Sequence, residues 1–588
     1  MNAVRALSFA GFATGLIAAG AAAETTSLTP PAAPKSAVER EAAIELPPMI
    51  ISESSKAAPW LYVAVDDTEY LSRCSATTTR AYVTAQLEIR RILHVFVPAD
   101  FFGTSAVRSV SLLAPLETGS GTDDAVRREM QRTAQQSMQA TNDENRRARR
   151  LPSPGQFRFL PNLRLDDRDM LAVFSYLSER DFRGENMIAA DDYVYARLVA
   201  RTPTLPGWLI QGITRLYPQT TTRVDPITMR PVRWLSPEDT AGLQRDPESR
   251  RVMIPASELF DIRALSTPEN QHPLRVAAWQ AQAALFVRWA LDPAQAPAAA
   301  SLWSFARRVS QEPATEAVFA ECFGFGYADL QERLSDYLPV AVKQPARILS
   351  GKLAPLPRFE IKPATPAQIA RLRGEWERLE IPFVRSKHPE FLPKYIEQAR
   401  TSLLRAVGRG DRDPRLLAAL GLCELDAGDA KAARPWLEQA AAARVAGPRV
   451  YYEIARLRWA ELIGGEPETS GFTAAQLQAV LEPLRVAASQ SPPLPEVYML
   501  MADAWLRCRE RVRASDLPTL VAATPLFRSI PGVSYRVALM QIREGQYAEA
   551  AKLLSVGAEF AIEANVRAQY QEVLAALAQS TKPTPEKE

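Results

Sequence analysis

The sequence predicts a two-part fold, with a mixed α+β domain followed by an all-helical region. A chain of 588 residues is too long for a single hydrophobic core. Strand-like segments occur before residue 186, and mostly helix-like segments follow up to residue 345, which is typical of an α+β domain. Beyond residue 375 the composition changes to Ala, Leu, Arg and Glu, which favour helices.

Charge and composition exclude some classes of partner. Hydrophobic residues make up 47% of the chain and charged residues 23%, which is ordinary for a globular protein. The formal net charge is only +3, so no strong field attracts nucleic acid or an anionic membrane. We therefore expect no nucleic-acid partner.

The beginning of the chain resembles a secretory signal peptide. Arg5 precedes an apolar stretch, and small residues stand before Glu24. We predict a signal peptide over 1–23 and export to the periplasm or the medium. An N-terminal membrane anchor is the alternative. No later apolar run is long enough to cross a membrane, so no transmembrane segment is expected in the mature chain.

The mature chain is expected to begin with a flexible linker over 24–58, which is rich in Pro, Ser, Ala and charge. The first domain, over 59–345, should contain strands or hairpins and one long helix at its start, and mostly helices from residue 186 on. The expected strand segments are 60–74, 107–115, 157–165 and 169–178, and the helix is 77–98. A Pro- and Lys-rich stretch then suggests a second linker over 346–389.

Residues 413–448 indicate two helices joined by a tight turn. Small residues alternate with large ones on the inner positions of this segment, which are Leu420, Gly421, Gly428, Ala433, Leu437 and Ala440. The segment resembles a tetratricopeptide repeat, although Glu424 stands where that family has an aromatic residue. A second segment, 534–561, is similar, with Gly545, Ala550 and Leu554 in comparable places. The resemblance covers about 390–578, and a disordered tail is expected over 579–588.

The repeat resemblance implies an all-α solenoid, because such units bury their faces only by stacking. Solenoids of this family usually bind a peptide, a helix or another protein. We therefore expect protein or peptide partners. The alternative is that the array only rests on the preceding domain or forms a dimer.

One stretch of the first domain resembles part of a zinc-peptidase site. The text "LPGWLIQGITRLY" has Pro206, Trp208, Leu209, Gly212 and Tyr217 on a pattern found in the peptidase-MA-like gluzincins. The resemblance covers roughly 59–340. It implies a gluzincin-like α+β fold.

The positions that carry the chemistry of that family are all changed. Asp191 and Tyr195 stand at the two zinc-histidine positions, Asp192 at the catalytic glutamate, and Gln211 at the third ligand. The three histidines of the chain, His94, His272 and His388, have no ligand spacing. The resemblance therefore implies a pseudopeptidase with no catalytic residues, no metal and no cofactor.

These observations predict an exported, non-catalytic scaffold or adaptor that binds partners through its repeats. A divergent metal-dependent hydrolase that uses Asp191, Asp192 and Gln211 is one alternative. A self-assembling structural component of the cell envelope is the other.

Overall fold

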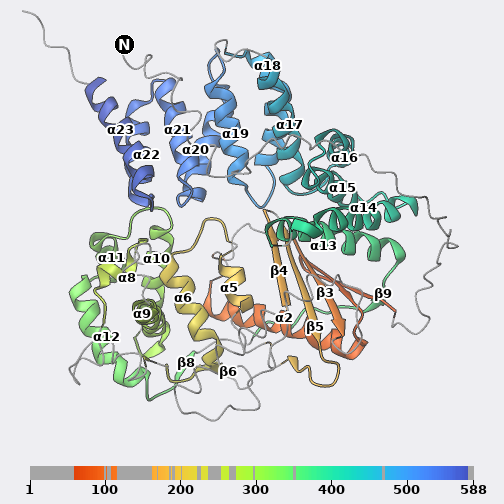
Figure 1. Ribbon diagram of the computed structural model, residues 1–588. Coiled ribbons are helices and arrows are strands. Elements are labelled where there is room, and N and C mark those ends of the chain that lie inside the picture. The colour runs from red at the N-terminus through yellow and green to blue at the C-terminus, as the bar shows by residue number, and fades with distance from the viewer. Residues whose placement is uncertain are drawn as a thin grey trace, which may run out of the picture. The chain divides into compact units, whose positions relative to one another are not determined.

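The computed structural model is mostly helical, with two sheets in the part of the chain that it describes (Figure 1). Residues Trp60–Leu574 form one compact unit. The described residues are 59–98, 101, 108–115, 162–168, 170–184, 187, 192–199, 201–221, 227–232, 234–235, 253–263, 273–295, 298–348, 353–387, 389–465 and 471–580. The expected signal peptide, the expected linker over 24–58 and most of the expected tail lie outside these ranges.

The larger sheet has the strand order β4-β5-β3-β2-β1-β9. Its strands are β1 (Leu61–Val65), β2 (Thr68–Ser72), β3 (Arg108–Pro115), β4 (Asn162–Asp167), β5 (Met170–Leu177) and β9 (Lys362–Pro363). The pairs β2–β3 and β3–β5 are parallel, whereas β1–β2, β4–β5 and β1–β9 are antiparallel. The strands expected over 60–74, 107–115 and 169–178 are confirmed, and 60–74 is a hairpin. Within the range 157–165, the structure describes only the part that belongs to β4.

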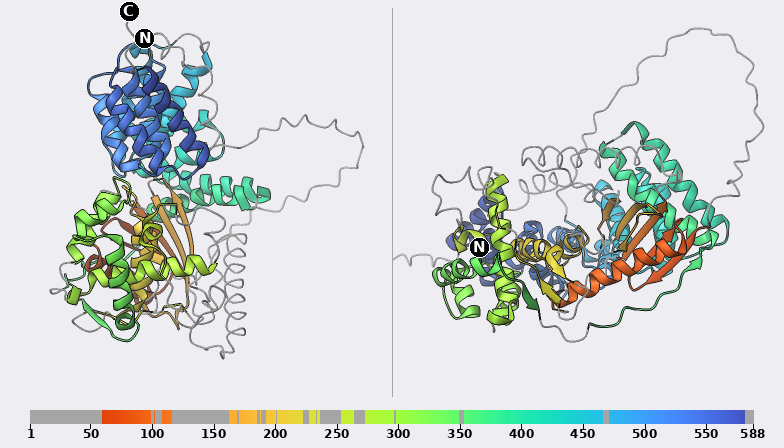
Figure 2. Two further views of the ribbon diagram at one scale, coloured as in Figure 1. Left: turned by 90° about the vertical axis from the view of Figure 1, so that its left-hand side faces the viewer. Right: turned by 90° about the horizontal axis from the view of Figure 1, so that it is seen from below.

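Both faces of this sheet are covered, so successive residues of a strand enter different cores. On β3, Val110 and Leu112 belong to one core, whereas Leu113 belongs to the other. The first of these cores includes residues of α13 (Pro366–Lys387), and the second includes residues of α2 (Ala76–Phe96). Figures 1 and 2 show α2 and α13 on the two sides of the strands. The predicted helix over 77–98 is thus confirmed as α2, whose N-cap is Ser75.

The remainder of the first domain is built around one buried helix. Its helices are α5 (Asp192–Val199), α6 (Gly207–Leu216), α8 (Ala256–Phe260), α9 (Pro273–Leu291), α10 (Ala298–Val309), α11 (Glu316–Phe323) and α12 (Tyr327–Ala341). The short 3-10 segments Tyr217–Gln219 and Pro293–Gln295 follow α6 and α9. A small sheet has the order β6-β7-β8, with β6 (Thr220–Thr221), β7 (Ile227–Met229) and β8 (Ala346–Ile348). Helix α9 packs against α6, α8, α10 and α12, which makes it the centre of this part.

Helical hairpins form the rest of the unit. They are α13 with α14 (Leu392–Gly408), α15 (Pro414–Asp426) with α16 (Ala430–Ala442), α17 (Arg449–Gly465) with α18 (Ala474–Ala488), and α21 (Pro531–Arg543) with α22 (Tyr547–Phe560). Between the third and the last hairpin lie α19 (Pro495–Leu506), α20 (Asp516–Ala523) and the 3-10 segment Thr524–Phe527, and α23 (Ala564–Ser580) comes last. Neighbouring hairpins also pack on each other, as in a stacked array (Figure 1).

The second helix of each hairpin has the same small-and-large pattern at its buried positions. The spacing of four and then three residues recurs in the sets Ala399, Leu403, Ala406; Ala433, Leu437, Ala440; Val480, Leu484, Ala487; and Ala550, Leu554, Gly557. In two hairpins, a glycine of the first helix faces the leucine at the middle of this pattern. A Cβ added to Gly374 would lie 2.5 Å from Leu403, and one added to Gly421 would lie 2.6 Å from Leu437. Both glycines therefore permit a close approach of two helices.

The array begins earlier than the sequence predicts. The segment expected as a linker, 346–389, contains the 22-residue helix α13, which pairs with α14 in the first hairpin. Its many charged residues suggest a solvent-exposed segment, but Arg371, Glu375 and Arg378 are buried. Their partners lie on the sheet and on α15, far away in sequence.

Candidate functional site

The four changed peptidase positions lie at and before α5 and on α6. Asp191 lies outside the described residues, and Asp192 is the first residue of α5. Tyr195 on α5 is 42% exposed. Gln211 on α6 accepts a hydrogen bond from Gln280 Nε2 of α9 at 3.3 Å. Helices α5 and α6 are neighbours.

Packing accounts for the residues that resemble the peptidase pattern on α6. A Cβ at Gly212 would lie 2.6 Å from Val287 and 2.8 Å from the backbone oxygen of Ala283 on α9, so only glycine allows this approach. The ring of Trp208 lies 5.4 Å from the rings of Phe260 and Phe286 in the aromatic core. Within the described ranges, no group of three or more His, Cys, Asp and Glu side chains is placed to hold a metal ion. Of the histidines, His94 is on α2, and His272 and His388 lie outside those ranges.

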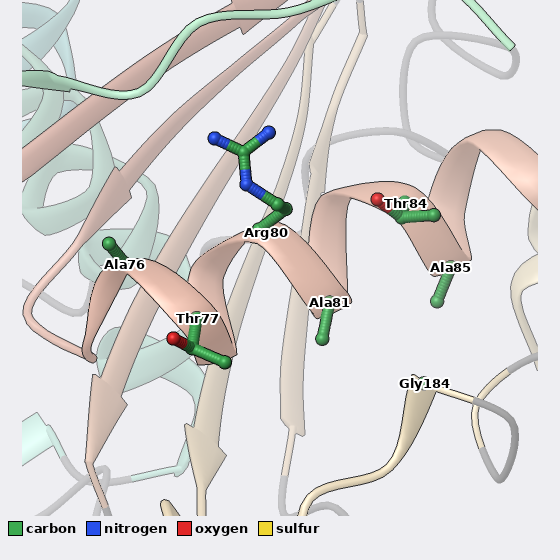
Figure 3. Close-up of a pocket in the computed structure, with 7 residues that line it drawn as sticks. All are labelled: Ala76, Thr77, Arg80, Ala81, Thr84, Ala85 and Gly184. Atoms are coloured by element: carbon green, nitrogen blue, oxygen red, sulfur yellow. The ribbon is translucent and has the colours of Figure 1, made fainter.

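A shallow hollow of about 480 Å³ lies along the start of α2 (Figure 3). Ala81 and Ala85 point toward Gly184, whereas Arg80 points to the other side of the helix. The guanidinium of Arg80 lies 5.4 Å from the ring of Phe359. Most of the lining side chains are small, so this hollow offers little to recognise a ligand.

The most strongly charged buried region joins the sheet to the first helices of the hairpins. We call it the charged seam, and it has two parts. The first part surrounds Glu69 of β2, and its members are Glu69, Arg108, Arg371, Glu375, Asp413 and Arg415. The second part surrounds Arg378 of α13, and its members are Asp167, Arg378, Asp426 and Arg449.

Three arginines from three different elements converge on Glu69. Arg371 Nη2 of α13 lies 2.6 Å from Glu69 Oε1, and Arg108 Nη2 and Arg415 Nη1 lie 2.9 Å and 3.0 Å from Oε2. Tyr62 Oη also donates to Oε1 at 2.8 Å. Burial alone would raise the pKa of Glu69, but Arg371, Arg108 and Arg415 outweigh it and hold that pKa well below its ordinary range.

Further along α13, Arg378 is shared between two carboxylates. Its Nη2 lies 2.8 Å from Asp167 Oδ2 of β4, and its Nη1 lies 3.2 Å from Asp426 Oδ2 of α15. Burial would raise the pKa of Asp167, but Arg378 and Arg449 lower it to about 2. For Asp426, burial prevails and raises the pKa. The shorter contact to Arg378 and the second cation, Arg449, explain why Asp167 holds its charge more firmly.

The charges of the seam balance. The part around Glu69 contains three carboxylates and three guanidinium groups, and the part around Arg378 contains two of each. Such pairing is what allows ionised groups to be buried, because an unpaired buried charge is very unfavourable. The seam therefore fixes the first helices of the hairpins on the sheet.

The local sequence does not reveal the charged seam. The signal on α13 is the spacing of Arg371, Glu375 and Arg378, which puts all three on one face of a helix. A charged helical face ordinarily indicates exposure to solvent. The partners of this face are on β2, β3, β4 and α15, and nothing in the local sequence connects them.

The fold and the seam define a class of protein: a mixed α and β domain joined by buried ion pairs to stacked helical hairpins. No family model matches the chain, and no curated protein matches it. The solved structures that it resembles include that of Pseudomonas aeruginosa pilF, with 15% identity over 37% of this chain and 92% of that chain. The TM-score of that comparison is 0.26, which is too low to support an argument about fold or function.

No helix in the described ranges is both long enough and apolar enough to cross a membrane.

Proposed function

We propose that this protein is an exported, non-catalytic scaffold that binds protein or peptide partners through its helical hairpins. The observation that carries the proposal is the stacked array, in which successive helices of the hairpins pack on one another. Arrays of this kind provide extended surfaces for partners. Export rests on the signal-like sequence over 1–23, and the gluzincin-like descent of the first domain rests on the pattern around Trp208 and Gly212.

Because the charged seam holds part of the array on the sheet, a smaller surface of the array remains for a partner. The face of α13 and α15 that carries Arg371, Arg378 and Arg415 is already held by the sheet. On the later helices, the positions that we assign to the corresponding face include Arg456 of α17 and Leu539 of α21. The side chain of Arg456 is 46% exposed, and Leu539 is half-buried. We therefore place the partner surface on α17, α19 and α21.

Site-specific photo-crosslinking in the native host tests this placement. A photoreactive amino acid at Arg456 or Leu539 of the full chain should crosslink to a protein partner. The same amino acid at the exposed positions Glu332 or Asp336 of α12 serves as the control. Crosslinks of equal yield from α12 and from the later helices would contradict a binding role for the array. A truncation before α13 is a poorer test, because it would uncover one face of the sheet.

Metal analysis of the purified chain tests the non-catalytic part of the proposal. We expect no stoichiometric zinc. Zinc at one equivalent that is lost in Asp191→Ala would overturn the scaffold and favour a metal-dependent hydrolase. Fractionation of the host cells checks export, and recovery of the full chain in the cytoplasm with residues 1–23 intact would contradict it.

A further inference from the structure

The last contact between the sheet and the hairpins is made by one arginine. Arg168 follows β4 and reaches α17 and α19, where Tyr452, Glu453 and Glu496 surround its guanidinium. Its Nη1 donates to Glu453 Oε1 at 3.4 Å, and its Nε lies 3.0 Å from Glu496 Oε1. The centre of the guanidinium is 5.2 Å from the centroid of the Tyr452 ring. We call Tyr452, Glu453 and Glu496 the guanidinium subsite.

The chemistry of this subsite suits an arginine better than any other side chain. Two carboxylates on different helices meet two different nitrogens of one planar group, while an aromatic ring lies against that group. A lysine ammonium has no planar fork with which to make the same set of contacts. Glu453 is itself buried and held in place by Arg449 Nε at 3.0 Å and Arg456 Nε at 2.6 Å. The subsite is therefore built into α17 and does not depend on Arg168 alone.

Arg168 is more exposed than Arg371 and Arg378, the central arginines of the two parts of the seam. Its side chain is 35% exposed, compared with 3% for Arg371. It stands outside the strands β4 and β5, so its displacement breaks no ladder hydrogen bond of the sheet. An ion pair that is partly open to solvent contributes little to stability, so a competing ligand can replace it.

We infer that the guanidinium subsite recognises an arginine of a partner protein and that Arg168 occupies it in the absence of that partner. The inference rests on the proposed function and specifies the chemistry of the partner: a segment with an exposed arginine that reaches α17 and α19. Arg168 then acts as an internal competitor. Its tether gives it a high effective concentration, which weakens the apparent affinity for a free segment.

Calorimetric titration of the full chain with short peptides tests the inference. The probe is a peptide with one central arginine between alanines, and the matched peptides carry lysine or the uncharged analogue citrulline. Arg168→Ala should bind the arginine peptide at least about tenfold more tightly than the unsubstituted chain does. The lysine peptide should bind Arg168→Ala more weakly, and the citrulline peptide should not bind.

A second substitution locates the binding. Glu496→Gln in the Arg168→Ala background should abolish the gain, and an unchanged circular dichroism spectrum and melting temperature show that the chain is folded. No binding of the arginine peptide to folded Arg168→Ala would overturn the inference. Equal binding to both chains, equal binding of all three peptides, or an undiminished gain in Arg168→Ala/Glu496→Gln would also overturn it.

The crosslinking experiment separates this inference from the proposed function. If positions 456 and 539 crosslink to a partner but the titration shows no arginine-dependent binding, the proposed scaffold remains and only the guanidinium subsite is overturned. Arginine-dependent titration without crosslinks would establish the subsite and contradict the proposed scaffold.

Discussion

In two regions, the sequence pattern and the structure differ in opposite ways. One region is helices α5 and α6, and the other is helix α13. The stretch through α5 and α6 resembles a zinc-peptidase site, yet its glycine and tryptophan are explained by packing against α9 and the aromatic core. The sequence of α13 resembles a charged linker, yet it carries the most buried charges of the described residues. A resemblance to a motif can thus reflect packing requirements alone. Buried charge, in contrast, depends on partners that lie elsewhere in the chain.

The largest expected effect is at the centre of the seam. Arg371→Ala leaves Glu69, Glu375 and Asp413 with too little positive charge in a buried place. The free energy of unfolding should fall by about 3–5 kcal/mol. Urea denaturation monitored by tryptophan fluorescence measures this loss in the free energy of unfolding.

Arg434→Ala is the matched control for Arg371→Ala. Arg434 pairs with Glu461 at the surface of the array, so its loss should cost less than about 1 kcal/mol. Equal losses in the free energy of unfolding for the two substitutions would show that the seam contributes no more to stability than a surface ion pair.

The next effect tests whether α13 belongs to the array. Gly374→Ala should lower the free energy of unfolding by about 1–3 kcal/mol, because its Cβ would collide with Leu403. Gly421→Ala should have a similar effect through Leu437. Thermal unfolding of the two variants measures the effect.

Gly408→Ala on α14 is the control, since a Cβ there meets nothing within 4 Å. It should be neutral or slightly stabilising, as alanine is a better helix former. A neutral Gly374→Ala would mean that α13 and α14 do not pack as closely as α15 and α16.

A third prediction concerns how the free energy of unfolding changes at acid pH through the part of the seam around Arg378. The folded-state pKa of Asp167 is depressed, so its contribution is complete above the ordinary pKa of an aspartate and disappears as the pH falls toward 2. This loss should amount to about 2 kcal/mol between pH of about 4 and about 2. Asp426, whose pKa is raised, acts in the opposite direction and offsets part of the loss.

Urea denaturation at a series of pH values measures this dependence. Asp167→Asn should be less stable than the unsubstituted chain at neutral pH and should show a smaller decline in acid. The exposed Asp336→Asn is the control and should keep the original decline. An unchanged slope in Asp167→Asn would show that Asp167 does not carry this pH dependence.

The smallest effect is expected at Gln211 on α6. Gln211→Ala removes one hydrogen bond, the one from Gln280, and should change the free energy of unfolding by about 1 kcal/mol or less. The same denaturation assay applies. A loss as large as that of Arg371→Ala would reverse the comparison between the two regions.

Local sequence patterns predicted much of the fold, but they could not predict ion pairs between residues that are far apart in the sequence. The strand-like segment 107–115 and the helical spacing over 77–98 gave β3 and α2 correctly, because each depends on residues close in sequence. The small residues Gly421 and Ala433 gave the hairpin α15–α16 for the same reason. The start of the array at α13 was missed, because only Glu69 and its neighbours on the sheet make those charges suitable for a core. For the candidate site, the sequence did not predict the seam, and the positions that resemble a peptidase site stay a prediction.

The distance along the chain between Glu69 and its partners has a consequence for synthesis. Five strands of the larger sheet have been synthesised once residue 177 has been made, but Arg371 and Arg415 come much later. Until then Glu69 lacks two of its three cations, and the face of the sheet that α13 will cover is open. The first domain therefore cannot reach its final state before the first two hairpins exist. We expect the growing chain to depend on protection during this interval, as chains with exposed strands and apolar faces commonly do.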